Sequence, residues 1–148
     1  MPNTTVTTVG FTQTSAEGFF ERLRKAGVKK VVDVRLHNTS QLAGFAKADN
    51  LAYFLKAIVG IQYTHQPLLA PTDVMLKAFK KEKGDWGVYQ DRFLTLMAER
   101  QIENRFRPEM FDGTCFLCSE ATPHHCHRRL VCEYLNGKWG GILMVQHL

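Results

Sequence analysis

Short apolar runs alternate along the chain with longer segments in which apolar residues recur every three or four positions. The short runs are rich in β-branched side chains, which favour extended backbone, so we predict them to be strands. They cover residues 4–9, 31–34, 61–64, 114–118 and 142–145. The run Val-Val-Asp-Val at residues 31–34 is apolar enough for a central strand of a parallel sheet, where both faces are buried.

The segments between these strands have the 3.6-residue periodicity of helices. The expected helices are one that ends at Gly27, one from Asp49 to Gly60, one over residues 74–81, one over 85–105, and one that starts at Thr122-Pro123 and ends near Gly137. Strands that alternate with helices imply βαβ units with right-handed crossovers. The pattern therefore predicts a single α/β domain over residues 1–148, with a mainly parallel central sheet of about five strands flanked by helices.

Polar residues stand at or just beyond several of the predicted strand ends. In open parallel sheets, ligands bind outside the carboxyl ends of the strands, so these residues are candidates for a common site. They are Asp33, Arg35, Cys118, Glu120 and His147.

The strand at 31–34 is expected to lie beside the strand at 114–118 or one place away, near the point where the strand order reverses. Because a buried charge needs a partner, either Asp33 or Glu120 should contact an arginine or a histidine.

Reactive side chains are concentrated in residues 113–135, GTCFLCSEATPHHCHRRLVCEYL. All four cysteines and three of the six histidines lie there. The predicted helix start makes this region electropositive, which attracts anions and favours a thiolate, so Cys126 is expected to have a lowered pKa. Cys115 and Cys132 are interpreted as core thiols, which pack as small hydrophobic groups.

These positions give two groups of candidate site residues. The candidate catalytic residues are Cys126, His127, Glu120 and Cys118. The candidate substrate-binding residues are Arg35, Arg128, Asp33 and His147.

A metal centre is the main chemical alternative at this cluster. Cys115 and Cys118 have CxxC spacing, but the two residues between them are Phe and Leu inside a predicted strand. A strand sends residues three apart to opposite faces, so this pair is not expected to form a structural zinc knuckle. No metal or other cofactor is assigned, although a looser zinc site formed by Cys118, Cys126 and a histidine remains open.

The composition is that of an ordinary globular protein, with 45% hydrophobic and 22% charged residues. The first residues lack the pattern of a signal peptide, and the most apolar stretch is too short to span a bilayer, so a cytoplasmic protein without a membrane partner is expected. The net charge of +5 modestly favours anionic partners. Nucleic acid is one such partner, through Lys77, Lys80, Lys81 and Lys83.

Several motifs together resemble the bacterial and archaeal domain-of-unknown-function family 488. They are VG near the start, VVDVR, GIQY, the W-x-x-Y-x-x-x-F pattern at Trp86, CFLCSE-x-x-P-x-x-CHR, and QHL at the end. The resemblance implies a compact α/β domain with its polar motifs at one edge of the sheet, and it implies no particular reaction. VDVR also occurs in rhodanese-like domains, but Arg128 stands too far from Cys118 for their active-site loop.

The leading functional hypothesis is a small enzyme, a Cys/His-dependent hydrolase or transferase, that acts on a phosphorylated or nucleotide-like substrate. Cys126 would be the nucleophile or a ligand, and His127 would handle protons. Arg35 and Arg128 would hold the anion. Two alternatives are a non-catalytic nucleic-acid-binding module and a metal-binding protein that uses the Cys/His cluster.

Overall fold

A five-stranded parallel sheet forms the centre of the protein, with the strand order β3-β2-β4-β1-β5. The computed structural model describes residues 4–12, 14–37, 44–119 and 126–148. The strands are β1 (Thr4–Gly10), β2 (Lys30–Asp33), β3 (Gln62–His65), β4 (Thr114–Cys118) and β5 (Leu143–His147). The predicted α/β fold is confirmed, and each strand lies within two residues of its predicted position.

The burial of each strand follows its place in the sheet. All five residues of β4 are buried, as are all but one in β1, because these strands are covered on both faces. The edge strands β3 and β5 keep exposed residues along their length. The continuous apolar runs in the sequence therefore mark the central strands.

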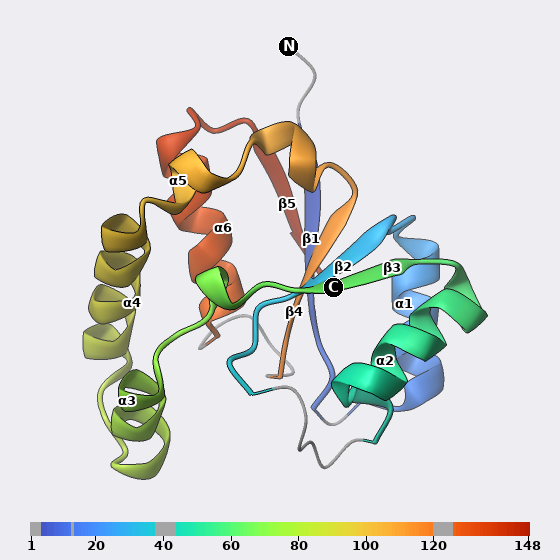
Figure 1. Cartoon of the computed structure of the whole chain (residues 1–148), viewed down its shortest axis with the longest axis horizontal. Helices are drawn as coiled ribbons and strands as arrows, with labels where there is room; N and C mark the ends of the chain where they lie inside the picture. Colours follow the sequence, from blue (N-terminus) through green and yellow to red (C-terminus); the bar gives the residue numbers. More distant parts are fainter. Residues whose placement is uncertain (1–3, 13, 38–43, 120–125) are drawn as a thin grey trace.

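Helices cover both faces of the sheet (Figure 1). One face, here called the α2 face, packs against α1 (Ala16–Lys25) and α2 (Ala48–Phe54) through residues such as Val9 and Leu117. The other, the α6 face, packs against α4 (Trp86–Arg100) and α6 (His127–Lys138) through residues such as Phe116. The shorter helices α3 (Asp73–Leu76) and α5 (Ile102–Arg105) lie on the α6 side.

Short helical turns extend or connect these elements. They are the 3-10 turns η1 (Gly44–Ala46), η3 (Pro67–Leu69) and η5 (Pro108–Phe111), and the π-helical turns η2 (Leu55–Val59) and η4 (Lys77–Lys81). Gly60 ends η2 in the left-handed conformation, at the position where the sequence predicts the helix to end. No helix in the described parts of the chain combines the length and apolar character needed to cross a bilayer.

Two helices differ from their sequence predictions. The helix expected over residues 85–105 is interrupted at Gln101, whose backbone has a φ of 51°, so that buried Ile102 begins the separate helix α5. The described part of α6 begins at His127, with Cys126 as an extended N-cap residue. The start predicted at Thr122-Pro123 falls on residues outside the described ones.

The chain leaves β2 and β4 in opposite directions, although these strands are neighbours. After β2 it continues through α2 to β3, and after β4 it continues through α6 to β5 on the other face. The two connections therefore diverge between the carboxyl ends of β2 and β4, which is where open α/β sheets bind ligands. The predicted adjacency of these two strands is confirmed.

Candidate functional site

A cavity of about 250 Å³ lies at the carboxyl ends of β2 and β4, on the α6 side. Its lining has three chemical components: a thiol and imidazole cluster, an aromatic wall, and basic side chains. The first comprises Cys118, Cys126 and His127, the second Phe79, Trp86 and Tyr89, and the third Arg35, His37 and Lys80. The divergence of the chain thus creates a hollow lined by reactive groups.

Cys118, Cys126 and His127 converge at this cavity. Their two sulfur atoms and one ring nitrogen all lie within 4.8 Å of one another. Cys118 is the last residue of β4, while Cys126 and His127 are the N-cap and first residue of α6. All three residues are buried, at 5%, 2% and 6% exposure, so access to them is through the cavity.

The hydrogen bonds of His127 fix the orientation of its ring. Its Nε2 lies 2.6 Å from the carbonyl oxygen of Val34, and because a carbonyl only accepts, Nε2 must donate a proton there. In the neutral ring the lone pair is therefore on Nδ1, which lies 3.5 Å from the sulfur of Cys118. The ring also packs against Phe93, with their centroids 5.4 Å apart. His127 can accept a proton or coordinate a metal ion through Nδ1.

The thiol pKa predicted for Cys126 is wrong in direction. Burial and the adjacent Cys118 raise the pKa of Cys126 well above its usual range, and this outweighs the lowering influence of His127. Burial has the largest influence, because a thiolate at this position loses its hydration. Burial likewise raises the pKa of Cys115 to about 12 and raises that of Cys132. Cys126 is therefore protonated in the absence of a proton acceptor or a metal ion.

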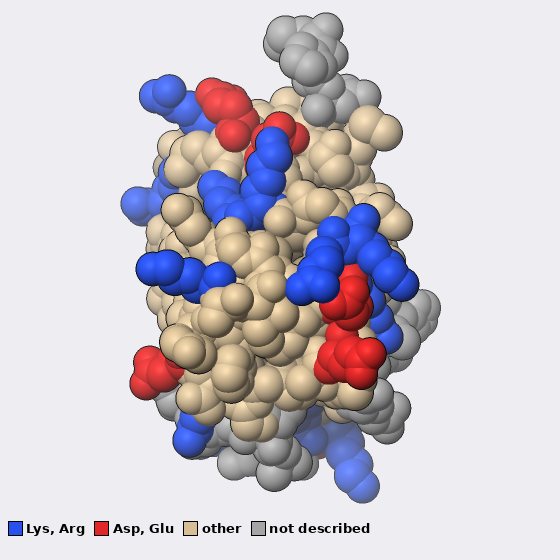
Figure 2. Space-filling model, turned by 90° about the vertical axis from the view of Figure 1, so that its right-hand side faces the viewer, with Lys and Arg blue, Asp and Glu red and all other residues tan. Residues whose placement is uncertain are grey.

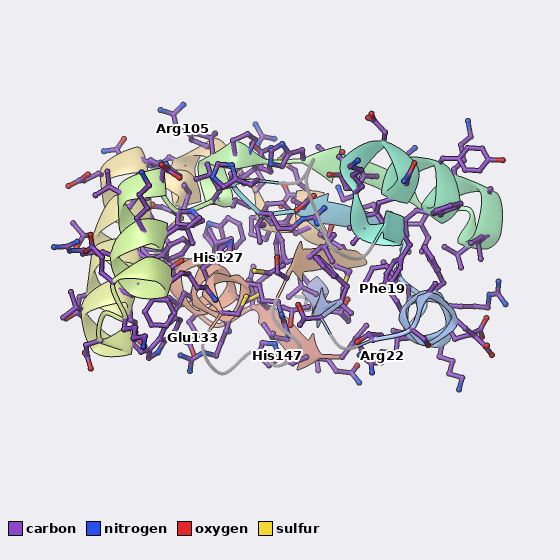
Figure 3. The ribbon with its side chains drawn as sticks, turned by 90° about the horizontal axis from the view of Figure 1, so that it is seen from below. Phe19, Arg22, Arg105, His127, Glu133 and His147 are labelled. Carbon is purple, nitrogen blue, oxygen red and sulfur yellow. The ribbon has the colours of Figure 1, made fainter. Side chains whose placement is uncertain are left out.

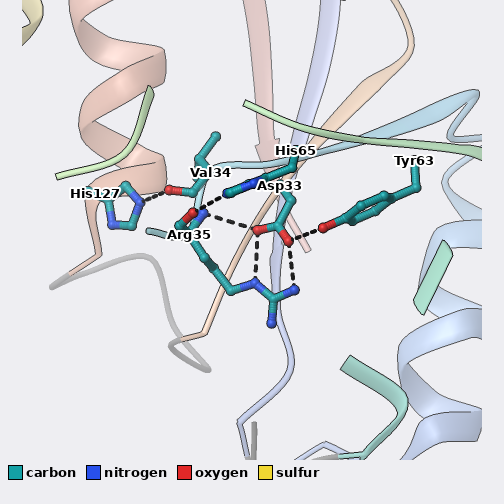
Figure 4. A network of polar contacts seen from close by, with 6 residues as sticks. All are labelled: Asp33, Val34, Arg35, Tyr63, His65 and His127. Atoms are coloured by element: carbon teal, nitrogen blue, oxygen red, sulfur yellow. Dashed lines mark hydrogen bonds and ion pairs between the residues drawn. The ribbon is translucent and has the colours of Figure 1, made fainter. Parts of the chain in front are cut away.

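Asp33 and Arg35 form a buried ion pair (Figure 4). The Nε and Nη2 atoms of Arg35 donate to the two carboxylate oxygens over 2.8 and 2.6 Å. The hydroxyl of Tyr63 donates to the same carboxylate, and a nitrogen of the His65 ring lies 2.7 Å from the Arg35 carbonyl. The prediction that a buried acid at this edge contacts an arginine is confirmed.

The guanidinium of Arg35 also stacks over the ring of Phe11, 5.2 Å from its centroid. Phe11 belongs to the core of the α2 face, whereas His127 packs against Phe93 on the α6 face. Arg35 lines the cavity nonetheless. Its Nη1 atom is buried and has no hydrogen-bond partner in the described residues.

Arg128 and His147 lie in a separate polar cluster. The Nε of Arg128 donates to the hydroxyl of Thr8 over 3.2 Å, and the same hydroxyl lies 2.5 Å from Nδ1 of His147. Neither residue lines the cavity, and Figure 3 shows His127 and His147 apart at this edge of the sheet. Successive helical residues point about 100° apart, so His127 and Arg128 face different strands.

The remaining predicted site residue, Glu120, lies outside the described residues. The aromatic wall, by contrast, is a part of the site that the sequence analysis did not assign. The rings of Trp86 and Tyr89 are stacked, with centroids 5.2 Å apart and an interplanar angle of 24°. Their spacing of three residues, which places them on one helical face, was the available signal. It indicates a buried face equally well, so it could not identify a cavity wall.

The chain belongs to the family described as domain of unknown function DUF488, whose model matches residues 15–135. No curated protein matches the chain. No solved structure matches it either.

Proposed function

We propose that this member of the DUF488 family is a small enzyme that binds a phosphorylated, nucleotide-like molecule in the cavity and acts on it by hydrolysis or group transfer. The observation that carries the proposal is the convergence of Cys118, Cys126 and His127 at the cavity. Cavities lined by apolar groups with a few convergent polar ones are the usual sites of small-molecule binding. Buried thiols elsewhere in the chain have no comparable imidazole partner among the described residues.

The aromatic wall supports a substrate with a planar ring. Phe79 lies 5.0 Å from Tyr89 and 5.5 Å from Trp86, measured between ring centroids, so the three rings contact one another and give the cavity an aromatic surface. Such a surface offers a flat molecule a large contact area and favourable ring-to-ring geometry. A nucleobase is a planar group of suitable shape.

The basic side chains support a negatively charged substrate. Lys80 and His37 line the cavity together with Arg35, whose Nη1 is buried without a hydrogen bond in the described residues. Arg129 lies nearby, with its guanidinium carbon 6.0 Å from the centroid of Trp86. A phosphate placed among these groups would receive charge-assisted hydrogen bonds. Arg128, which is engaged with Thr8 away from the cavity, is not included in this binding set.

Non-catalytic binding of nucleic acid remains the rival function. Of the lysines that suggested it, Lys80 lines the cavity and Lys77 lies 3.9 Å from Asp73. Figure 2 shows the side of the molecule with α1 and α2, where basic and acidic side chains lie next to one another over a largely uncharged surface, whereas these two lysines belong to η4, which follows α3 on the opposite side.

Tryptophan fluorescence tests the binding step. The chain has two tryptophans, so Trp139→Phe leaves Trp86 as the reporter in the cavity. We expect nucleoside monophosphates to change this signal saturably and to bind at least about tenfold more tightly than the uncharged nucleosides. Lys80→Ala should weaken binding, whereas Lys77→Ala, a lysine that does not line the cavity, should leave it unchanged. His127→Gln should keep binding but lose any turnover detected by phosphorus NMR.

The proposal fails if no phosphorylated compound gives a saturable signal, or if Lys77→Ala weakens binding as much as Lys80→Ala. The rival function makes a different prediction with duplex DNA. If the protein is a nucleic-acid-binding module, its affinity for duplex DNA should rise about a thousandfold when the salt concentration is lowered, because counterions are released from the phosphates.

A further inference from the structure

We propose that Cys118, Cys126 and His127 bind one zinc ion, with the fourth coordination position open to the cavity. Two sulfur atoms and one imidazole nitrogen form the ligand set, and all lie within 4.8 Å of one another. The nitrogen is assigned as Nδ1, because Nδ1 lies beside the Cys118 sulfur and Nε2 is bonded to the Val34 carbonyl. This inference depends on the geometry of the three residues and does not require the identity of the substrate. It adds to the proposed function by specifying how the reactive cluster would work.

The distances fit a tetrahedral zinc site. With Zn–S bonds of about 2.3 Å and Zn–N bonds of about 2.0 Å, the sulfur–nitrogen edge of the tetrahedron is about 3.5 Å and the sulfur–sulfur edge about 3.8 Å. The sulfur of Cys118 lies 3.5 Å from Nδ1 of His127. The other two pairs lie within 4.8 Å, so the sulfur–sulfur pair needs to close by at most about 1.0 Å and the second sulfur–nitrogen pair by at most about 1.3 Å, which small side-chain rotations can provide. Thiolate and imidazole ligands together favour zinc over magnesium or calcium.

His127 has the second hydrogen bond expected of a metal ligand. Imidazoles that coordinate a metal through one nitrogen generally donate the other N–H to a carbonyl or a carboxylate, which fixes the ring. Here Nε2 donates to the Val34 carbonyl, so Nδ1 is left to face the two sulfurs. Val34 is itself held by its N–H, which donates to the Leu117 carbonyl of β4 over 3.0 Å. The ring is therefore oriented by the central sheet.

The position of Cys115 shows why the CxxC spacing does not describe this site. Cys115 packs in the core of the α2 face, and Cys118 in that of the α6 face. Cys115 and Cys118 therefore face opposite sides of the sheet, which is the geometry that argued against a CxxC zinc knuckle. It excludes only Cys115, because the neighbours of Cys118 in the cluster come from the start of α6.

The site has the form of a catalytic zinc centre more than that of a structural one. Structural sites have four protein ligands, whereas catalytic sites have three and keep one position for water or substrate. In the described part of the chain, no fourth Cys, His, Asp or Glu belongs to the cluster. The open position would face the cavity lined by Trp86 and Tyr89, where zinc could polarise an oxygen of a bound substrate.

Elemental analysis of the purified full chain tests this assignment. After incubation with Zn²⁺ and removal of free metal, the protein should retain roughly one zinc per chain. Cys118→Ala and Cys126→Ala should each reduce retained zinc at least about tenfold, because each removes a ligand. Cys132→Ala is the matched control: it removes a buried thiol from α6 that is not in the cluster, and it should retain zinc. Circular dichroism checks that each variant is folded.

A second measurement avoids dependence on variants that fail to fold. Wild-type protein loaded with Co²⁺ should show the visible absorption of tetrahedral cobalt and a thiolate charge-transfer band with the intensity of two cysteine ligands. The zinc assignment is overturned if the wild type retains less than about a tenth of an equivalent. It is equally overturned if Cys118→Ala and Cys126→Ala retain as much zinc as Cys132→Ala.

Metal binding and the proposed function can fail separately. If the protein holds no zinc but still binds nucleoside monophosphates beside Trp86, only the metal assignment is wrong. If it holds zinc through these residues and binds no phosphorylated compound, only the proposed substrate class is wrong.

Discussion

Two buried polar groups lie on either side of the junction between β2 and β4, and they differ in how their hydrogen-bonding atoms are occupied. On the α2 side, both oxygens of Asp33 accept hydrogen bonds, from Arg35 and Tyr63. On the α6 side, His127 uses one nitrogen to bind the Val34 carbonyl and directs the other toward two thiols at a cavity.

This difference separates a role in folding from a role in function. A buried acid whose oxygens are all engaged holds the end of β2 in place, and removing it leaves an uncompensated charge. A buried imidazole with a lone pair at a cavity is arranged to receive a proton, a substrate or a metal ion. Burial alone does not distinguish the two, since Asp33 and His127 are 0% and 6% exposed.

The largest effect is expected from Asp33→Asn. This change leaves the buried guanidinium of Arg35 without its counter-charge and should lower the free energy of unfolding by about 3–5 kcal/mol. Urea denaturation measures the loss. The matched control is Asp73→Asn, which removes an exposed partner of Lys77 and should cost less than about 1 kcal/mol. If the two variants lose the same stability, the ion pair between Asp33 and Arg35 does not hold the end of β2 in place.

The next largest effect concerns thiol reactivity. With metal removed by a chelator, Cys118 and Cys126 should react with iodoacetamide at least about a hundredfold faster than Cys115 and Cys132, because only the first pair lines the cavity and the second needs the core to open. The lowered pKa expected from the sequence would also have made Cys126 reactive, but its pKa is raised, so access through the cavity is the reason for the expected difference. Mass spectrometry of the first labelled residues measures the order.

Labelling of Cys115 or Cys132 before Cys118 and Cys126 would show that the cavity does not give preferential access to the second pair. Restoring Zn²⁺ provides an internal control, because bound metal should protect Cys118 and Cys126 while leaving the rates of the other two unchanged.

The smallest effect is expected at the third polar cluster, where His147 contacts Thr8. Burial, followed by Arg128 and Arg129, lowers the pKa of His147 in the folded protein, so the folded state binds fewer protons than the unfolded state. Its contribution to stability is therefore complete above the unfolded pKa of about 6.5 and is lost as the pH falls from there through the lower folded pKa.

The measurement is a comparison of urea midpoints at about pH 7.5 and about pH 5.5. His147→Gln should make the decrease at low pH slightly smaller than in the wild type. The difference should be small because His147 is an exposed residue of an edge strand. A steeper decrease in the variant would mean that His147 is charged in the folded protein.

The sequence alone determined the elements of the fold and the place of the site. Apolar runs and helical periodicity depend on local backbone geometry, so they located the five strands within two residues of their observed positions. Because the carboxyl ends of parallel strands share one edge, the same pattern brought Arg35, Cys118 and Cys126 to one location. Asp33 could likewise be expected to need a cationic partner.

Only the tertiary structure decided which of these residues face one another. His127 and Arg128 are adjacent in sequence, yet a rotation of about 100° along the helix directs one to Val34 and the other to Thr8. The aromatic wall comes from α4, which supplies Trp86 and Tyr89 about thirty residues before Cys118, and from η4, which supplies Phe79, and no local pattern specifies that packing. The acidity of Cys126 depends on dehydration by all its neighbours, which raises its pKa and which the sequence does not reveal.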